Sequence, residues 1–219
     1  MQSILITGAA NGLGRAFLEH YAQEEKERKN RIFAVDVSWP GTTATAAAAV
    51  ADTTTTTDNE KNNQISYHQT DITSSADLDT LVKTLKSAGV SKLDLVIHSA
   101  GIRGLVVDDS APTRITQSSD VAKAETLAVM TPATLLRTFE VNTAALNAIV
   151  KSLAIDMPDV CFLVVHPGRV ATALCQGVRE DNAMEPAEVL PGLVGLVEER
   201  CSLADSGRFV DRFGEDIGW

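Results

Sequence analysis

The chain has 219 residues, 44% of them hydrophobic, which is enough to bury a sizeable core. It carries 29 acidic and 19 basic residues, and the resulting net charge of −10 disfavours general attraction to nucleic acid or to an anionic membrane. The N-terminus lacks a signal-peptide pattern, no segment approaches 18 consecutive apolar residues, and the three cysteines have no CxxC spacing, so we expect a soluble, cytoplasmic protein without a metal site.

The first 36 residues have the pattern of a strand, a helix and a second strand. A β-type run at residues 3–7 is followed by a glycine-rich turn and then by apolar residues at helical spacing, namely Leu13, Phe17 and Tyr21. The run RIFAVD at 31–36 predicts a strand buried on both faces of a parallel sheet. The threonine- and alanine-rich stretch that follows, residues 41–64, predicts a low-complexity surface insertion without a function of its own.

Further strands and helices alternate after this insertion. ISYHQTD at 65–71 predicts a third strand, and Ser74 with Asp77 is typical of the start of a helix. LDLVIHSAG at 93–101 predicts a fourth strand that ends in a turn of small residues.

The C-terminal half continues in the same way. Thr131 and Pro132 predict the start of a helix, and CFLVVHPG at 161–168 predicts a strand. Residues 186–200 predict a helix that is broken or started by its prolines, and RFVD at 208–211 predicts a last strand. This alternation predicts one α/β domain over residues 1–219, with a Rossmann-type, doubly wound, mostly parallel sheet and helices on both of its faces.

The turn TGAANGLG, residues 7–14, has the features of a dinucleotide-binding loop. Gly8 allows a tight exit from the strand, Gly12 lets a pyrophosphate approach the backbone, and Gly14 allows close helix packing. The helix that follows offers unpaired N–H groups to an anion. Asp36 ends the second strand, where a carboxylate can bind the adenosine ribose and repel a 2′-phosphate. The turn therefore predicts a nicotinamide dinucleotide cofactor, with NAD favoured over NADP.

The spacing TGxxxGxG resembles that of the short-chain dehydrogenase/reductase family, and other segments agree with it in order. Thr70-Asp71-Ile72 resembles the family's adenine-contacting segment, and residues 98–101, HSAG, resemble its NNAG turn with both asparagines replaced. Residues 166–172, HPGRVAT, resemble the segment that faces the nicotinamide, and with the ending SGRFVDRFGEDIGW they are most similar to the C-factor or sniffer-like branch.

The resemblance implies a set of cofactor-binding residues spread over the chain. They are Thr7, Gly8, Asn11, Gly12, Leu13, Gly14, Asp36, Asp71, Ile72, Ser99, Ala100, Gly101, Pro167, Gly168, Val170 and Thr172.

The family's catalytic residues are a Tyr-x-x-x-Lys pair, a serine on the preceding strand and an asparagine on the helix before that strand. The only tyrosines of this chain, Tyr21 and Tyr67, are each followed four residues later by an acid, so neither fits the pair. FEVN at 139–142 resembles the end of the asparagine motif, and the residues that follow resemble those after the catalytic lysine, with Thr143 at the seam. Of the family's catalytic residues, the resemblance leaves Asn142 alone as a candidate.

The two joined halves share one helical stripe, which predicts a continuous helix that starts after Pro132. The stripe consists of Leu135, Phe139, Leu146, Ile149, Val150 and Leu153. A helix of about 20 residues spans roughly 30 Å, enough to cross a sheet and return the chain as a parallel strand. We therefore expect a sheet with one strand fewer than in the family, in which the CFLVV strand lies beside the strand at 93–98.

Four residues admit two interpretations each. Asn142 is either a remnant of a proton relay or an amide that binds backbone groups. His98 and His166 end strands at the edge where α/β sheets bind ligands, and either can donate a proton or be structural. Arg169 can pair with a pyrophosphate or with a surface carboxylate.

Three hypotheses of function follow. The first is an NAD(P)-dependent oxidoreductase that transfers hydride between the cofactor and an unknown carbonyl compound or secondary alcohol, with impaired activity. The second is an inactive cofactor-binding protein with a regulatory or interaction role. The third is a shortened splice form or gene model of an active enzyme. A homo-oligomer is compatible with the family, whereas nucleic acid and membrane are not expected partners.

Overall fold

The structure is a computed structural model that describes residues 2–23, 29–39, 57–58, 63–104, 121, 123–124, 126, 129–144, 155, 157–175, 178 and 180–218. The chain divides into two compact units, residues 1–100 and 101–219, and each is described by itself. The single domain expected from the sequence stays a prediction. Within the described ranges, no helix is both long and apolar enough to span a membrane.

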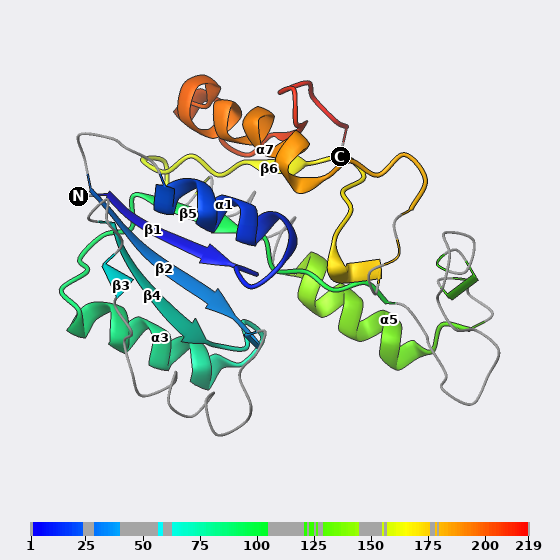
Figure 1. Cartoon of the computed structure of the whole chain (residues 1–219), viewed down its shortest axis with the longest axis horizontal. Helices are drawn as coiled ribbons and strands as arrows, with labels where there is room; N and C mark the ends of the chain where they lie inside the picture. Colours follow the sequence, from blue (N-terminus) through cyan, green and yellow to red (C-terminus); the bar gives the residue numbers. More distant parts are fainter. Residues whose placement is uncertain are drawn as a thin grey trace. The chain divides into compact units, whose positions relative to one another are not determined.

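The first unit contains a five-stranded sheet with the order β3-β4-β2-β1-β5 (Figure 1). β1, β2, β4 and β5 run parallel to one another, whereas β3 pairs antiparallel with β4. This order confirms the doubly wound arrangement, because the chain moves outward from β1 to β2 and β4 and then returns to the other side of β1. The strands are β1 (Gln2–Thr7), β2 (Asn30–Asp36), β3 (Thr57–Asp58), β4 (Gln64–Gln69) and β5 (Leu95–His98).

The core of the first unit lies on both faces of β2. The side chains of Phe33 and Val35 pack against Leu81 and Leu85 of α3 (Ser75–Ser87). Because strand side chains alternate, Ile32 points to the opposite face. There α1 (Gly12–Gln23) packs on β1 and β2, and Figure 1 shows α1 and α3 on opposite sides of the sheet. The predicted burial of this strand on both faces is confirmed.

The first helix ends on two buried asparagines. Asn63 donates through its amide nitrogen to the carbonyl oxygens of Tyr21 and Ala22, and Asn30 donates to that of Tyr21. The backbone N–H of Asn30 donates to Oδ1 of Asn63 at 2.9 Å. Carbonyls in the last turn of a helix have no intrahelical partner, so these amides satisfy groups that burial would otherwise leave without one.

Part of the predicted insertion is described, and its bounds stay a prediction. Residues 57–58 form a strand, and residues 63–64, at its C-terminal end, belong to the folded unit. Polar composition indicates exposure only on average, and it did not identify an asparagine whose amide fits buried carbonyls. The other residues of the insertion lie outside the described residues.

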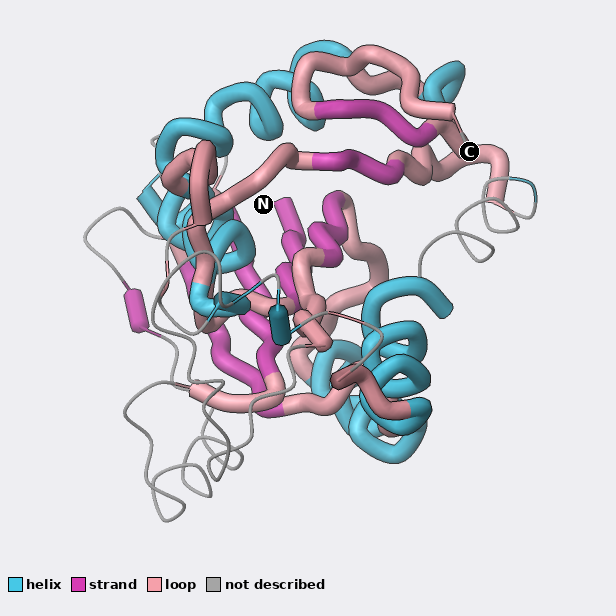
Figure 2. Tube along the Cα trace, turned by 90° about the vertical axis from the view of Figure 1, so that its right-hand side faces the viewer, coloured by secondary structure: helices cyan, strands magenta, loops and turns pink. Residues whose placement is uncertain are grey.

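The second unit contains a two-stranded parallel sheet of β6 and β7 (Figure 2). The helix predicted at 186–200 begins at Pro186, so a start at a proline is confirmed, whereas a break at Pro191 is not observed. It is α-helical to Gly195 and π-helical from Leu196 to Arg200, and it buries Val189, Leu193 and Leu196. The elements of this unit are α5 (Pro132–Phe139), π-helix η1 (Glu140–Ala144), β6 (Val164–His166), 3₁₀-helix η2 (Ala173–Cys175), α7 (Pro186–Gly195), π-helix η3 (Leu196–Arg200), 3₁₀-helix η4 (Leu203–Asp205) and β7 (Phe209–Asp211).

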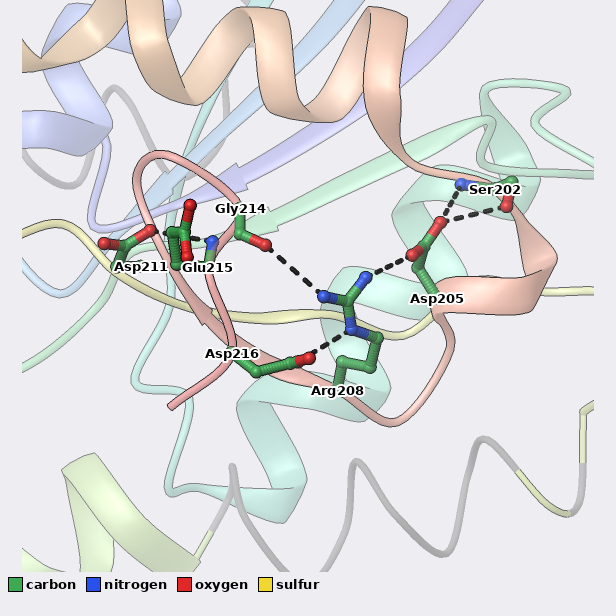
Figure 3. Close-up of polar contacts among 7 residues, drawn as sticks. All are labelled: Ser202, Asp205, Arg208, Asp211, Gly214, Glu215 and Asp216. Carbon is green, nitrogen blue, oxygen red and sulfur yellow. Dashed lines mark hydrogen bonds and ion pairs between the residues drawn. The ribbon is translucent and has the colours of Figure 1, made fainter. Parts of the chain in front are cut away.

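Arg208 holds the end of the chain against the turn before β7 (Figure 3). Its guanidinium donates to the carboxylates of Asp205 and Asp216 and to the carbonyl oxygen of Gly214. These hydrogen bonds and ion pairs raise the pKa of Arg208 above its ordinary value, so the side chain is a permanent cation. The predicted last strand at 208–211 is confirmed as β7.

The structure describes the start of the joined segment and the strand that follows it. β6 pairs with β7 in the second unit, and β5 pairs with β1 in the first. The expected place of the CFLVV strand beside β5 therefore stays a prediction. α5 begins at Pro132 with Thr131 as its N-cap, and η1 follows it directly, so the described part of the expected helix runs through the seam at Thr143. The side chains of Leu135 and Phe139 are 52% and 57% exposed. Periodicity identifies which residues share a face, whereas burial also needs an element that packs on that face. Residues 145–154, the rest of the predicted helix, lie outside the described residues.

Candidate functional site

Two close approaches of the backbone shape the glycine turn between β1 and α1. Gly8 has a φ of +68°, and a Cβ atom there would lie 2.8 Å from backbone atoms of Ser99 and Ala100. A Cβ atom at Gly14 would overlap the carbonyl group of Gly8. Gly12, with a φ of +56°, starts the helix. The three glycines are therefore required by geometry, as the spacing predicts.

Backbone hydrogen bonds connect this turn to the ends of β2 and β5. The N–H of Ala9 donates to the carbonyl of Val35, and that of Ala10 donates to Oδ2 of Asp36 at 2.9 Å. Across the other side, the N–H of Ala100 donates to the hydroxyl of Thr7 at 3.3 Å. The carboxyl ends of these parallel strands thus form one continuous edge.

The N-terminus of α1 lies on this edge. The first turn of the helix, all of it described, contains no acidic side chain. Its N–H groups point out of the helix and carry the positive end of the helix dipole. Asp36, at the end of β2, is the nearby carboxylate, and its second oxygen accepts a hydrogen bond from the N–H of Ser38 at 3.3 Å. The edge can therefore hold an anion at the helix and a hydroxyl donor at Asp36.

Asp71 and Ile72 follow β4 on the same edge. The N–H of Thr70 donates to the carbonyl of Asp36, which ties the end of β4 to that of β2. Oδ1 of Asp71 accepts from both the N–H and the hydroxyl of Thr73, at 2.9 Å and 2.7 Å. This carboxylate therefore orders its own turn.

His98 is tied to β1 at the end of β5. Its Nδ1 shares a hydrogen bond of 2.9 Å with the hydroxyl of Thr7. Partial desolvation of the ring by its neighbours lowers the pKa of His98 below its ordinary value near 6.5. The neutral imidazole is therefore favoured, which weakens the hypothesis that His98 supplies a proton at neutral pH.

The segment that follows β6 belongs to the second unit. Gly168 has a φ of +87°, and its N–H donates to Nδ1 of His166 at 3.0 Å. Val170 forms an isolated parallel bridge with Met184. The hydroxyl of Thr172 accepts weakly from the N–H of Leu174 at 3.4 Å. These residues form a turn with local hydrogen bonds, and their predicted contact with a nicotinamide stays a prediction.

Asn142 binds the backbone of one residue with both ends of its amide. Its Oδ1 accepts from the N–H of Ile102 at 2.8 Å, and its Nδ2 donates to the carbonyl of Ile102. Oδ1 is also the nearest atom to a Cβ built at Gly101, at 3.4 Å. Among the two interpretations of Asn142, this geometry favours an amide that fixes the loop after β5.

Arg169 lies 3.8 Å from a carboxylate oxygen of Glu180, which is the carboxylate alternative of the two left open by the sequence. Arg103 binds both oxygens of the same carboxylate. Sequence reasoning missed Arg103 and Glu180, because 77 residues separate them and no spacing rule connects them.

The sixteen predicted cofactor residues fall into two groups. Eleven lie in the first unit, at the carboxyl edge of its parallel strands, and the structure brings these together. The other five, which begin with Gly101, lie in the second unit, together with Asn142.

Comparison with known families identifies the chain. The family model for short chain dehydrogenase matches residues 2–146, which is more than half of the sequence. The chain belongs to the short-chain dehydrogenase family. No curated protein matches the sequence.

Solved structures of short-chain dehydrogenases and related reductases share the fold. The NADPH-bound carbonyl reductase from chicken fatty liver has 19% identity and a TM-score of 0.66, with 100% of this chain and 99% of that chain covered. A 4-hydroxyisoleucine dehydrogenase complexed with NADH has 15% identity and a TM-score of 0.60, with 98% of each chain covered. The Sniffer protein of Caenorhabditis elegans has 17% identity and a TM-score of 0.56, with 99% and 98% covered.

The two tyrosines of this short-chain dehydrogenase chain have packing roles. The side chain of Tyr21 in α1 is fully buried and lies against Phe17 and His20. Tyr67 in β4 packs edge-on against Trp39, with the ring centroids 5.1 Å apart. Neither is arranged as a proton donor on the edge of the sheet.

Proposed function

We propose that this chain binds a nicotinamide dinucleotide at the carboxyl edge of β1, β2, β4 and β5, and that it transfers hydride between this cofactor and a carbonyl compound or secondary alcohol slowly or not at all. The observation that carries the binding proposal is the glycine turn, which approaches the end of β5 too closely for any residue with a Cβ, contacts Asp36 and leads directly into the N-terminus of α1. Family membership and neighbours whose structures hold NADPH or NADH support it.

Each residue on the edge has a distinct role in this proposal. The N–H groups at the start of α1 would bind the pyrophosphate, and Asp36 would accept hydrogen bonds from the adenosine ribose. Asp71 and Ile72 would lie at the adenine. In the second unit, Gly168 to Thr172 would contact the nicotinamide amide. The ending SGRFVDRFGEDIGW supports the further proposal that the chain belongs to the C-factor or sniffer-like branch.

NAD is the proposed cofactor in preference to NADP, because the carboxylate of Asp36 repels a 2′-phosphate. Titration with NADH and with NADPH, followed by the fluorescence of the bound nicotinamide, tests this. We expect tighter binding of NADH to the parent chain. The variant Asp36→Asn keeps the acceptor for the N–H of Ala10 but removes the charge. It should gain about tenfold in affinity for NADPH, since a unit charge pair contributes roughly 1 kcal/mol or more at this range. Equal affinities for both cofactors in the parent would contradict the proposal.

Slow turnover follows from the missing proton donor. The cofactor supplies hydride, and the protein must exchange a proton with the substrate oxygen, for which the family uses tyrosine. Loss of a general acid costs about 10²–10⁴ in rate. His98 is favoured in its neutral form, and both tyrosines pack in the first unit.

A panel of aldehydes, ketones and secondary alcohols, each assayed with the cofactor that binds, separates the functions. Binding without turnover would favour the second candidate, a cofactor-binding protein with a regulatory role. Turnover at rates ordinary for enzymes would contradict the proposed impairment. Absence of cofactor binding would overturn both candidates.

The third candidate, a shortened form of an active enzyme, rests on the abrupt junction at Thr143. Sequencing the transcript across this codon tests it. A transcript with an additional segment that encodes a Tyr-x-x-x-Lys pair would show that the longer protein is the enzyme. A transcript that matches the present sequence would exclude this candidate.

A further inference from the structure

Arg103, Arg169 and Glu180 come together from three loops of the second unit. Arg103 follows Ile102, whose backbone is bound by Asn142. Arg169 follows the glycine turn after β6, and Glu180 lies in the segment before α7. The guanidinium of Arg103 donates through both Nη atoms to the two oxygens of Glu180, with 3.1 Å between Nη2 and Oε1. Nη1 of Arg169 lies 3.8 Å from the same Oε1.

Arg103 and Glu180 are mostly buried, whereas Arg169 is mostly exposed. Glu180 is 12% exposed and Arg103 is 25% exposed, whereas Arg169 is 61% exposed. The fork between Arg103 and Glu180 is therefore largely withdrawn from water, and Arg169 reaches it from the solvent side. Such a buried pair is a weak source of stability, because desolvation of both charges offsets most of their attraction. A contribution to stability therefore does not explain why Arg103 and Glu180 are held together away from water.

We propose that Arg103 and Arg169 form a binding site for the carboxylate of a small substrate, and that Glu180 occupies this site when no substrate is bound. The inference rests on the proposed function, because Arg169 belongs to the segment proposed to contact the nicotinamide. It deepens that function by naming the substrate class, a carbonyl compound that carries a carboxylate.

The chemistry of the contact favours a carboxylate over other anions. A planar guanidinium binds the two oxygens of a carboxylate through parallel N–H groups, and this is the arrangement that Glu180 shows. Exchange of one carboxylate for another conserves these hydrogen bonds and leaves no charge buried alone. The cost of desolvating Arg103 is already met by the fold.

Glu180 can leave the site without unfolding a helix. It lies between η2 and α7, in a turn where the N–H of Ala183 donates to its carbonyl oxygen and Asn182 has a φ of +60°. A tethered carboxylate competes with a free one at an effective concentration in the millimolar range. We therefore expect weak binding to the parent chain and tighter binding once the charge of Glu180 is removed.

Pyruvate, which has both a carbonyl and a carboxylate, is the probe, and its methyl ester is the neutral match. Binding is measured without cofactor by NMR titration and by the shift in melting temperature, at constant ionic strength in NaCl. The parent should bind pyruvate and should show no binding of the methyl ester. Glu180→Gln should bind pyruvate at least tenfold more tightly, whereas Glu199→Gln, which removes a charge from an exposed side chain of η3, should equal the parent.

The variant Arg169→Gln keeps the fork between Arg103 and Glu180 and should fold even if Glu180→Gln does not. It should lose at least tenfold in pyruvate affinity. The proposal is overturned if the parent gives no response beyond that to NaCl, if Arg169→Gln binds like the parent, or if phosphate competes as well as pyruvate does. NADH binding is titrated separately, so its failure would affect the proposed function and leave the pyruvate result readable.

Discussion

Gly8 and Gly89 share a left-handed backbone but differ in their surroundings. Their φ values are +68° and +76°, yet a Cβ atom at Gly89 would meet nothing within 4 Å, whereas one at Gly8 would collide with the backbone of Ser99 and Ala100. The pair therefore separates the cost of backbone conformation from the cost of close packing.

We expect Gly8→Ala to destabilise the chain by about 2–4 kcal/mol, the sum of a left-handed residue and an overpacked contact. Gly89→Ala should cost about 1 kcal/mol, since only the backbone term applies. Urea unfolding of both variants and the parent measures this difference. Equal losses for the two variants would show that the turn relaxes around the added methyl group.

The role of the buried Asn63 also depends on contacts that are distant in the sequence. Asn63 is 1% exposed and serves three backbone groups at the end of α1 and the start of β2. In the sequence it is one polar residue among many in a low-complexity stretch. Its role depends on carbonyls more than 40 residues away, which no local pattern reports.

Among the elements, α3 and α5 illustrate why helix starts are easier to predict than helix burial. Both begin where the sequence predicts, after Ser74 and Thr131, because a side-chain oxygen accepts from a backbone N–H in the first turn. α3 then buries Leu81 and Leu85. α5 buries none of its residues. Capping is local, whereas burial depends on a second element.

The C-terminal segment depends on one cation. Arg208 reaches Asp205, Asp216 and the carbonyl of Gly214, so it joins both sides of β7 (Figure 3). We expect Arg208→Gln to reduce the hydrogen-exchange protection of backbone amides in residues 211–217, with little effect on the first unit. Arg208→Lys keeps the charge but loses the fork and should be intermediate. Unchanged protection in Arg208→Gln would mean that the backbone hydrogen bonds suffice.

Two opposing effects act on the free energy of unfolding of the whole chain as pH falls. Acidification reduces the net charge of −10 and so relieves repulsion, but salt at 0.15 M screens exposed charges beyond about 8 Å. Desolvation lowers the pKa of both His68 and His98 below the ordinary value. At these two residues the unfolded chain therefore binds protons more readily than the folded chain does. Their contribution to the free energy of unfolding is fully present above pH 6.5 and declines as pH falls through the lowered pKa values.

At 0.15 M salt, we expect the urea midpoint of unfolding to be lower at pH 5.5 than at pH 7.5. In the variants His68→Gln and His98→Gln the decline should be smaller, and smallest in the double variant. A midpoint that rises on acidification would mean that charge repulsion outweighs the two histidines. Protonation of carboxylates contributes only at lower pH, because their ordinary pKa values lie near 4.

The family, the order of the main strands and helices, the caps at Ser74 and Thr131 and the three glycines of the turn could all be predicted from the sequence. These follow from rules that act over a few residues: strand patterning, capping and the backbone freedom of glycine. The absence of a Tyr-x-x-x-Lys pair is likewise a property of the sequence alone. The cofactor contact of Asp36 stays a prediction.

Three contacts became visible only in the folded chain: Asn142 binds Ile102, β6 pairs with β7, and Arg103 and Arg169 converge on Glu180. These groups are 40 or more residues apart in the sequence, except Arg169 and Glu180, whose approach depends on how two loops fold back. Local propensity does not encode such approaches, because they follow from the packing of the whole unit.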